Sequence, residues 1–427
     1  MSCPSRLLQW HQEVSTAFAH LSKPQVWGLV LWSAGIARAG TAGIPQISAL
    51  LALVLQQQEQ AVFQRLREWY LDAQQKSGKK RRELEVTSCF ASLLRWIVRL
   101  WEPGNRQMAL VLDATHLGER WTILSISVLI RCCAVPVAWK VLRGHEKGLW
   151  RPHWEGLLTH LKGCIPADWQ VMVMADRGLY ARWLFQAICA CGWHPFLRIN
   201  LGVKARALGE EAFEWISRWT PRPGTSWKGQ LECFASKASR LRCSLLRHWE
   251  AGYEHPWAVL TDLEPEQAEV SWYGMRTWVE TGYKDFNRGL WGWHHSKMQT
   301  ASCVERLWLA MAVAQVWTVS VGGVAEAMQV QEARGEQLPA SHIACRRRKR
   351  PLDQPPPRRL SCVVRGRLGI VAALFTAEML PVGRLVAQAW PQSITPPRKL
   401  PRPSQRRERE RKREQKRRAR VRARTAA

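Results

Sequence analysis

The sequence is poor in acidic residues. Among its 427 residues, 34 are Asp or Glu against 63 Lys or Arg, which gives a formal net charge of +29. So large an excess of one sign indicates a polyanionic partner, and nucleic acid fits that description best. An anionic membrane surface is the competing partner. Because carboxylates are scarce, those that interrupt apolar segments are the first candidates for chemistry.

Other expected signals are also missing. The twelve cysteines contain no C-x2-C pair, so the sequence offers no paired zinc knuckle. The first residues lack a basic segment followed by an apolar core, so no signal peptide is expected. The two apolar stretches, residues 26–37 and 307–319, are shorter than the roughly 20 residues that cross a bilayer, and both are expected to be buried helices. These absences predict a cytoplasmic protein with reduced thiols that does not enter a membrane.

Hydrophobic residues make up 46% of the chain, enough for a sizeable core, and the length predicts two or three domains. Residues 1–105 have helical patterns and are expected to form a basic, helical DNA-binding region. Within it, Ser22 and Pro24 mark a helix start, and residues 47–74 are expected to form one long helix. No specific helix-turn-helix motif can be assigned.

The pattern changes to α/β at residue 106. "MALVLDATHL" and "DWQVMVMADRG" each contain a short, continuously apolar strand that ends in an acid. Strand-like and helical segments alternate between and after them, which predicts a mixed sheet in an α/β domain over residues 106–322. Residues 200–262 turn to short strand-like segments and are expected to be a β-rich insertion.

After Gly323 the chain is expected to contain less regular secondary structure. Residues 346–360 form a basic, proline-rich linker, and residues 361–391 are expected to hold a small helical element. Between Arg398 and Arg424 there are 15 basic and 3 acidic residues, a net charge of +12 (15 − 3). Such a tail is expected to be disordered alone and attracted to phosphates. Residues 323–427 are therefore predicted to be a basic, partly disordered C-terminal region.

Three carboxylates stand out. Asp113 and Asp176 each end an apolar strand, and the carboxyl ends of such strands are where α/β sheets place ligands. Glu280 lies on a later helical segment, "SWYGMRTWVETGYKDFN", on the same face as Tyr273 and Arg276. Three carboxylates from distant segments of a basic protein suit a Mg²⁺ site. Two such ions can promote phosphodiester chemistry.

Structural roles compete with this interpretation. An Asp at a strand end often caps the next turn, so Asp113 and Asp176 could each do no more than that. Glu280 could pair with Arg276 or with Lys284, because both lie four residues away on a helix.

The same residues resemble a known family, the DDE transposases of bacterial insertion sequences, in the branch marked by Tyr-x2-Arg-x3-Glu-x6-Lys (insertion sequence family 4). "LVLDATHLG", "VMADRGLYARWLF" and "WYGMRTWVETGYKDFNRGLWGW" resemble its three acidic motifs. Their order agrees with the family, with 63 residues from Asp113 to Asp176 (176 − 113) and 104 from Asp176 to Glu280 (280 − 176). The resemblance covers residues 108–322 well and extends weakly to the stretch beginning at Leu21.

The resemblance implies an RNase H-like catalytic core in which the strands ending at Asp113 and Asp176 are neighbours. It implies that Asp113, Asp176 and Glu280 are the catalytic residues and bind two divalent ions, Mg²⁺ or Mn²⁺. Water would cut DNA at the end of the element, and the freed 3′-OH would then attack target DNA. The partners it implies are terminal inverted repeats and target DNA, held by a synaptic homodimer.

Further roles follow from the same resemblance. Tyr273 and Arg276 would hold a phosphate near the cleaved end. Trp227, in "GTSWKGQ", is a candidate for stacking on a flipped base, with a place in the core as the alternative.

One position departs from the family pattern. Its final lysine would fall at Asn287, so Lys284 and Arg288 are the nearest cations that could bind DNA. His116, close behind Asp113, is expected to support the site or the fold, and His294 and His295 are expected to face solvent.

The sequence therefore predicts a transposase. The alternatives are an RNase H-like nuclease without strand transfer and a catalytically silent DNA-binding protein derived from a transposase.

Overall fold

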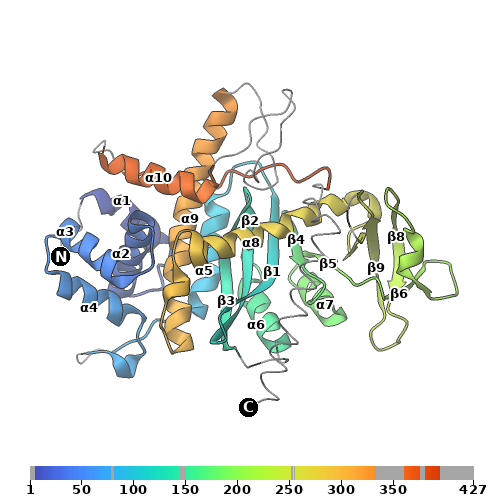
Figure 1. Ribbon diagram of the computed structural model, residues 1–427, viewed down its shortest axis with the longest axis horizontal. Helices are drawn as coiled ribbons and strands as arrows, with labels where there is room; N and C mark the ends of the chain where they lie inside the picture. Colours follow the sequence, from blue (N-terminus) through green and yellow to red (C-terminus); the bar gives the residue numbers. More distant parts are fainter. Residues whose placement is uncertain are drawn as a thin grey trace, which may run out of the picture.

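In the computed structural model, residues 5–332 are described except for 78–80, 145, 147, 149, 252 and 254, and so are residues 360–375 and 380–394. The described residues form a mixed α/β structure built on one ten-stranded sheet, flanked by helices (Figure 1). The strands are β1 (Gln107–Leu117), β2 (Trp121–Ile130), β3 (Cys133–Arg143), β4 (Gln170–Ala175), β5 (His194–Arg198), β6 (Lys204–Ala207), β7 (Glu214–Trp215), β8 (Ser226–Cys233), β9 (Leu241–His248) and β10 (Trp257–Thr261).

The helices are α1 (Ser5–Ala17), α2 (Lys23–Ala39), α3 (Ile44–Leu55), α4 (Glu59–Tyr70), α5 (Thr87–Leu100), α6 (Arg151–Leu161), α7 (Arg182–Cys189), α8 (Trp278–Lys284), α9 (Ala301–Glu332) and α10 (Cys362–Phe375). The expected alternation of strands and helices after residue 106 is confirmed in order and type.

The sheet has the strand order β3-β2-β1-β4-β5-β10-β9-β8-β6-β7. β1, β4 and β5 are parallel to one another, whereas β2 and β3 form an antiparallel hairpin beside β1. Every residue of β2 is buried, and most of β1 and β4 is too. Strands covered on both faces read as continuous apolar runs, which is why these segments were recognisable in the sequence. The segments from 200 to 262 extend the same sheet through β6–β10.

The two faces of the sheet are packed by different elements. Along β1, Met108, Leu110 and Leu112 belong to the large apolar cluster that includes residues of α5, α6 and α9. Ala109 and Val111 point the other way, into a smaller cluster with residues of a helical segment from 270 to 289. Side chains of a strand alternate between faces, so Asp113 continues the second series.

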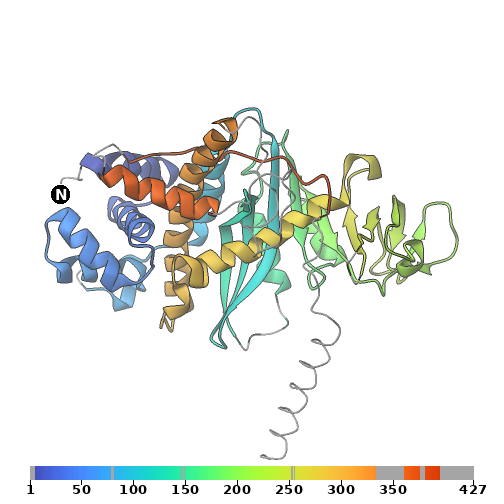
Figure 2. The same ribbon diagram turned by 45° about the horizontal axis from the view of Figure 1, so that its top comes forward.

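α9 is the central helix of the large cluster, and α1, α2, α4, α5 and α10 surround it (Figures 1 and 2). Residues 301–328 are long and apolar enough to cross a membrane, but 94% of their most apolar window is buried inside the protein, as expected of a core helix. The bent pair α2 and α3 passes the same test only if counted as one span. The expected loss of order after Gly323 is wrong as far as Glu332, because α9 continues to that residue.

The expected single helix over residues 47–74 is also wrong. It divides into α3 and α4, which contact each other, and Gln56 closes α3 in the left-handed conformation with φ 53°. The run of three glutamines from Gln56 to Gln58 provides no apolar contact to continue the stripe, so the chain turns there without a glycine or proline.

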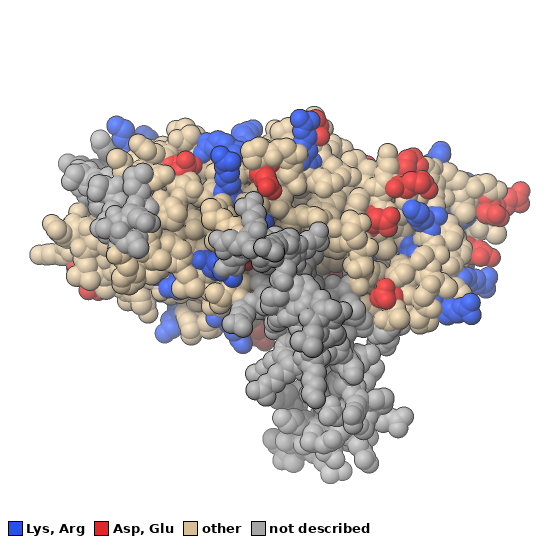
Figure 3. Space-filling model, turned by 90° about the horizontal axis from the view of Figure 1, so that it is seen from above, with Lys and Arg blue, Asp and Glu red and all other residues tan. Residues whose placement is uncertain are grey.

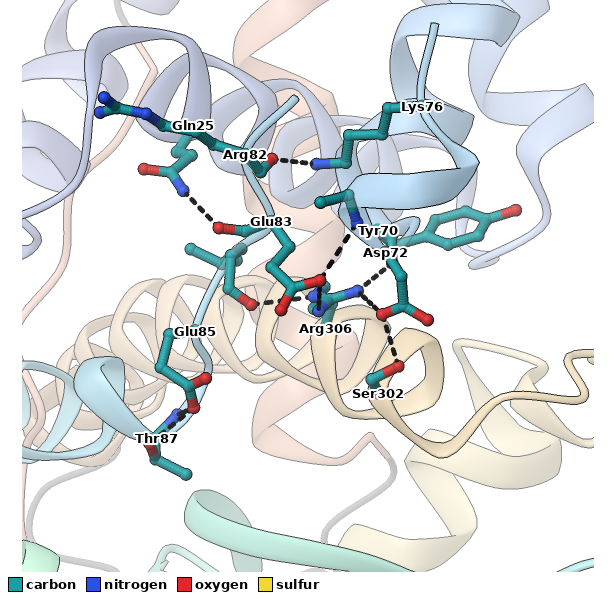
Figure 4. Close-up of polar contacts among 12 residues, drawn as sticks. Gln25, Tyr70, Asp72, Lys76, Arg82, Glu83, Glu85, Thr87, Ser302 and Arg306 are labelled. Carbon is teal, nitrogen blue, oxygen red and sulfur yellow. Dashed lines mark hydrogen bonds and ion pairs between the residues drawn. The ribbon is translucent and has the colours of Figure 1, made fainter. Parts of the chain in front are cut away.

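A buried arginine fastens the segment between α4 and α5 to α9 (Figure 4). The Arg306 guanidinium donates to the carbonyl oxygens of Leu84 (2.8 Å) and Tyr70 (2.9 Å) and to Asp72 Oδ1 (2.8 Å). Ser302 Oγ donates to the same Asp72 oxygen at 2.7 Å. The helical region and the sheet region are thus joined by polar contacts as well as by the common apolar cluster.

The C-terminal part of the described chain is helical only in α10; residues 380–394 are extended. The small helical element expected within residues 361–391 is confirmed as α10, and it ends at Phe375. The proline-rich linker up to residue 359 and the basic tail lie outside the described residues.

Candidate active site

Strand register brings Asp113 and Asp176 together. β1 and β4 are parallel neighbours with Leu112 opposite Ala175, so the two acids follow at the same level of the sheet. Met172 and Met174 belong to the same cluster as Val111, and by alternation Asp176 faces the same side as Asp113. Asp113 Oδ1 accepts from the backbone N–H of Ala114 (2.9 Å), and Asp176 Oδ1 accepts from Gly178 (2.8 Å). Asp176 therefore has the local turn contact of the competing interpretation. Asp113 does not, because β1 continues to Leu117, and the expectation that this strand ends at Asp113 is wrong.

Glu280 comes from a segment that crosses this side of the sheet, here called the site helix (residues 270–289). It begins as a 3₁₀ helix (Val270–Thr277), continues as α8 and ends in a π-helical turn (Asp285–Gly289). The expected uniform α-helix is therefore wrong. Because a 3₁₀ helix has three residues per turn, Tyr273 and Arg276 still align, and Glu280 follows Arg276 by one α-helical turn.

Arg276 draws the three acids together. Its Nη2 lies 2.9 Å from Asp113 Oδ2 and 3.5 Å from Asp176 Oδ2, and its Nη1 lies 3.7 Å from Glu280 Oε1. The side chains range from 16% exposed at Asp113 through 45% at Asp176 to 59% at Glu280. The site thus opens to solvent from a buried floor, and all three predicted carboxylates converge on one guanidinium.

At the buried end of the site, burial and neighbouring charge shift the pKa of Asp113 and of Arg276 in opposite directions. Burial raises the pKa of the Asp113 carboxyl above its ordinary value, although Arg276 acts in the opposite direction. For Arg276, burial acts to lower the pKa, but the carboxylates, Asp113 first, outweigh it and raise the pKa. Three acids gathered this closely need a cation among them, and here Arg276 is that cation.

The donor set suits a hard divalent cation, because it consists of carboxylate oxygens from three separate segments. Within the described ranges, however, no group of three or more His, Cys, Asp or Glu side chains is arranged to hold a metal ion. The predicted ligands surround Arg276 instead. Metal binding by Asp113, Asp176 and Glu280 therefore stays a prediction.

Tyr273 lies beneath the site. Its side chain is buried, its hydroxyl donates to the carbonyl oxygen of Ala175 (3.2 Å), and burial raises its pKa to about 12. It ties the site helix to the strand that carries Asp176. Its predicted contact with a DNA phosphate has no counterpart among these contacts and stays a prediction.

Arg198 is a nearby cation that the sequence did not reveal. β5 is parallel to β4 with Leu197 opposite Ala175, so Arg198 follows at the level of Asp176. Its guanidinium lies 5.8 Å from the centroid of the Tyr273 ring and 5.7 Å from that of Trp257. The only signal in the sequence was an arginine at the end of an apolar strand, and its importance depends on a strand pairing that the sequence does not state.

Asn287, which stands where the family pattern has its final lysine, lies in the π-helical turn at the end of the site helix. The Asn287 side chain is half-buried, and among the described residues its Oδ1 has no hydrogen-bond partner. A π-helical turn inserts one residue relative to an α-helix, so Arg288 takes the helical position that residue 287 would otherwise have. Lys284 and Arg288 are both exposed, as is Glu280.

The remaining candidates make their contacts with residues other than the three acids. Trp227, on β8, is half-buried and packs on Trp219 with ring centroids 4.4 Å apart, so its place in the core is visible and base stacking stays a prediction. His116 is exposed, and its Nδ1 lies 2.9 Å from the Thr122 hydroxyl. His294, expected to face solvent, is half-buried and hydrogen bonds to the carbonyl oxygen of Asn287; His295 is exposed.

A groove of about 510 Å³ opens beside the turn that follows Asp176. Tyr180, Trp183 and Phe234 provide aromatic walls, and Arg151 and Arg182 provide positive charge. Aromatic rings beside guanidinium groups are compatible with nucleic acid.

Comparisons with known proteins give little further guidance. No protein-family model matches the sequence, and no curated protein matches it. A cryo-EM structure of the piggyBac transposase synaptic complex with hairpin DNA is similar over 77% of this chain and 73% of that chain, with 11% sequence identity and a TM-score of 0.37. A likeness of that size does not establish a shared fold.

Proposed function

We propose that this protein is a DDE transposase that cleaves DNA at the ends of a mobile element and transfers the freed 3′-OH into target DNA. The observation that carries the proposal is the convergence of Asp113, Asp176 and Glu280, from two strands and a distant helix, around one cation. The order β3-β2-β1-β4-β5, with the hairpin antiparallel to β1, is also what an RNase H-like core would have. The motif resemblance supplies the reaction.

In this proposal Asp113, Asp176 and Glu280 would hold two Mg²⁺ or Mn²⁺ ions, which when bound supply charge neutralisation and activation of an attacking oxygen. Arg276 would then turn from the acids towards a DNA phosphate, which a guanidinium binds with two parallel hydrogen bonds. Tyr273 would keep the site helix at the correct height above β4. Arg198, Lys284 and Arg288 would contact phosphates on either side of the scissile bond.

The remaining parts take supporting roles. The helical region 1–105 would bind the terminal inverted repeats, the domain 106–322 would carry the chemistry, and Trp227 would stack on a displaced base. A homodimer would hold two ends together. The protein would act in the bacterial cytoplasm, on the nucleoid.

The test uses purified protein with DNA that flanks its coding sequence, a target plasmid and Mg²⁺ or Mn²⁺. We expect joined products that are lost, by at least about a hundredfold, in Asp113→Ala, Asp176→Ala and Glu280→Ala, because loss of one metal ligand removes several kcal/mol of transition-state stabilisation. Asp168→Ala is the matched control, since Asp168 is an exposed acid paired with Arg106 at the opposite end of β1. Triad variants as active as the control would reject the proposal.

A second function is favoured by one observation. Asn287 replaces the signature lysine, and its side chain turns partly inward. If the wild type binds end DNA but neither cuts nor joins it with either metal, the protein is a DNA-binding derivative of a transposase. Cutting without joining would instead indicate a nuclease.

A further inference from the structure

The groove of about 510 Å³ lies where the start of α7 meets the turn between β8 and β9. Figure 1 shows α7 between α6 and the end of the sheet that carries β6, β8 and β9. The lining residues come from the starts of α6 and α7 and from the turn after β8: Arg151, residues 180–183 and 186, and residues 234, 238 and 239. None of these lining residues is an acid. Pockets of about 300 to 1,000 Å³ are the ones that hold small organic groups, so a nucleotide would fit.

Two parallel aromatic rings line the groove. The rings of Tyr180 and Phe234 have an interplanar angle of 6° and centroids 6.1 Å apart. Both residues are half-buried, and so is Trp183, the third aromatic residue of the lining. A nucleobase has a flat π-face whatever its identity, so it stacks on partly exposed rings of this kind without sequence preference.

Phe234 has a backbone conformation that a bulky residue rarely adopts. Its φ is +67°, in the left-handed region that glycine occupies without cost. Its backbone N–H donates to the carbonyl oxygen of Lys204 (2.9 Å), which fixes this conformation at the end of β8. A glycine would relieve the strain and would also remove the ring from the groove. Strained conformations concentrate at ligand sites, where the position of the side chain matters, so this outlier points to a ligand.

Two guanidinium groups give the groove its positive charge. Arg151 Nε donates to Glu155 Oε1 (2.8 Å), an exposed pair that contributes little energy, and its guanidinium lies 5.4 Å from the centroid of the Trp183 ring. Arg182 Nη1 donates to the Ala238 carbonyl oxygen (2.9 Å), which holds the turn after β8 against α7. Among the described residues, the other N–H groups of both guanidiniums have no protein partner, so they can donate to phosphate oxygens.

The groove begins four residues beyond Asp176. The Leu179 N–H donates to the Asp176 carbonyl oxygen (3.0 Å), so the chain turns from the acid directly into the groove at Tyr180. Asn200, two residues after Arg198 at the end of β5, donates from Nδ2 to the Tyr180 hydroxyl (3.3 Å). The ends of the parallel strands β4 and β5 therefore lead both to the candidate active site and to the groove, which are neighbours at one edge of the sheet.

We propose that this groove binds a single strand of DNA, with one unpaired base against the rings of Tyr180 and Phe234 and a neighbouring phosphate on Arg151 and Arg182. It is a separate site from Trp227, which lies at the opposite end of β8 from Phe234. On the face shown in Figure 3, the basic and acidic side chains of the described residues are interspersed and form no single large basic patch, so local sites matter for binding. The proposal rests on the proposed function only in taking DNA as the ligand.

The experiment measures the affinity of the full chain, in EDTA, for a fluorescent single-stranded DNA of about 12 nucleotides and for the matching duplex. We expect Phe234→Gly and Tyr180→Ala to weaken single-strand binding by about 5- to 100-fold, because the stacking of one base is lost, and to leave duplex binding unchanged. Phe234→Gly removes the ring at a position where glycine is unstrained, so its thermal stability should persist. Tyr180→Phe should bind like the wild type. Trp215→Ala is the control, since Trp215 is 44% exposed on β7 and does not line the groove.

Two further measurements separate the base from the phosphate. An abasic oligonucleotide should bind the wild type and Phe234→Gly equally, because it has no base to stack. Arg182→Gln should lower the salt dependence of single-strand binding by about 0.7 in the logarithmic slope, the loss of one phosphate contact, whereas Arg218→Gln, at an exposed arginine that does not line the groove, should not. Unchanged single-strand affinity in Phe234→Gly and Tyr180→Ala, or an equal loss with the abasic strand or the duplex, would overturn the proposal.

The outcomes separate this proposal from the proposed function, because the binding measurements need neither metal nor cleavage. If no DNA is cut in the presence of metal but Phe234→Gly loses single-strand binding, the transposase activity is rejected and the groove stands as a single-strand site. If the triad variants behave as expected and the groove variants bind single strands normally, only the groove proposal fails.

Discussion

Arg276 is the residue on which the candidate site depends most. Within the part of the chain that the structure describes, it contacts Asp113, Asp176 and Glu280 together, and no other cation does so. A guanidinium suits this place because its planar fork reaches several oxygens and it stays charged when partly buried. The same properties suit a phosphate, so one side chain can neutralise the acids in one state and bind DNA in another.

The π-helical turn leads to a prediction about the departure at Asn287. Arg288 is exposed and takes the helical position of the missing lysine, whereas the Asn287 side chain turns partly inward. We expect Arg288→Gln to reduce cleavage about 10- to 100-fold, the loss of one charge-assisted contact. Asn287→Lys should give no gain and should lower the melting temperature, because the ammonium group must leave a partly buried position.

Steady-state cleavage rates and thermal melts check both variants. Arg106→Gln is the matched control, because Arg106 is an exposed arginine at the opposite end of β1. A gain of activity in Asn287→Lys, or wild-type rates in Arg288→Gln, would contradict the assignment.

At the scale of elements, the segment between α4 and α5 depends on Asp72 and Arg306. Burial acts to raise the pKa of Asp72, but hydrogen bonds from Arg306 and Ser302 outweigh it and hold the pKa below its ordinary value. A carboxyl with a lowered pKa in the folded state contributes stability above its unfolded pKa of about 3.9 and loses that contribution as the pH falls through the folded value. Asp72→Asn should therefore cost about 1 kcal/mol near pH 7.

Urea unfolding at several pH values measures this difference. The free energies of unfolding of Asp72→Asn and the wild type should converge only as the pH falls below the lowered folded-state pKa of Asp72, where the wild-type carboxyl is neutral in both the folded and the unfolded state. Asp168→Asn is the control, because its ion pair with Arg106 is exposed and should contribute little at any pH. A constant difference across the pH range would show that the charge of Asp72 is not what stabilises the segment.

Strands and helices with a clear pattern of apolar residues could be predicted from the sequence. Features that depend on contacts between distant segments could not. β1 and β4 are buried on both faces, so each appears as an apolar run ending in an acid. The turn at Gln56 has no glycine or proline to mark it. The site helix does contain Gly274, Gly282 and Gly289, but these glycines do not indicate a change from 3₁₀ to π geometry. Arg198 was missed because its position beside Asp176 depends on the pairing of β4 with β5, which no local pattern states.

At the scale of the whole molecule, the helical region and the sheet region share one core. Trp10 of α1 stacks on Trp317 of α9 with ring centroids 4.2 Å apart and an interplanar angle of 13°. The large apolar cluster is one connected group that includes residues from both regions, among them Leu7 and Leu385. A boundary near residue 105 therefore divides the chain by its secondary structure, while the packed core extends across it.

That shared core predicts how fragments behave. A fragment of residues 106–394 would expose the face of α9 that α1, α2, α4 and α5 cover, including the fully buried Trp317. Each large apolar side chain moved into water costs about 1.5 to 3 kcal/mol, and a domain is stable by only about 5 to 15 kcal/mol. We expect the fragment to aggregate or to show no cooperative unfolding, whereas the full chain unfolds in a single calorimetric transition over its core. Size-exclusion chromatography and calorimetry of the two proteins decide the matter: a soluble, monomeric fragment with a sharp transition would show that the sheet region is a domain on its own.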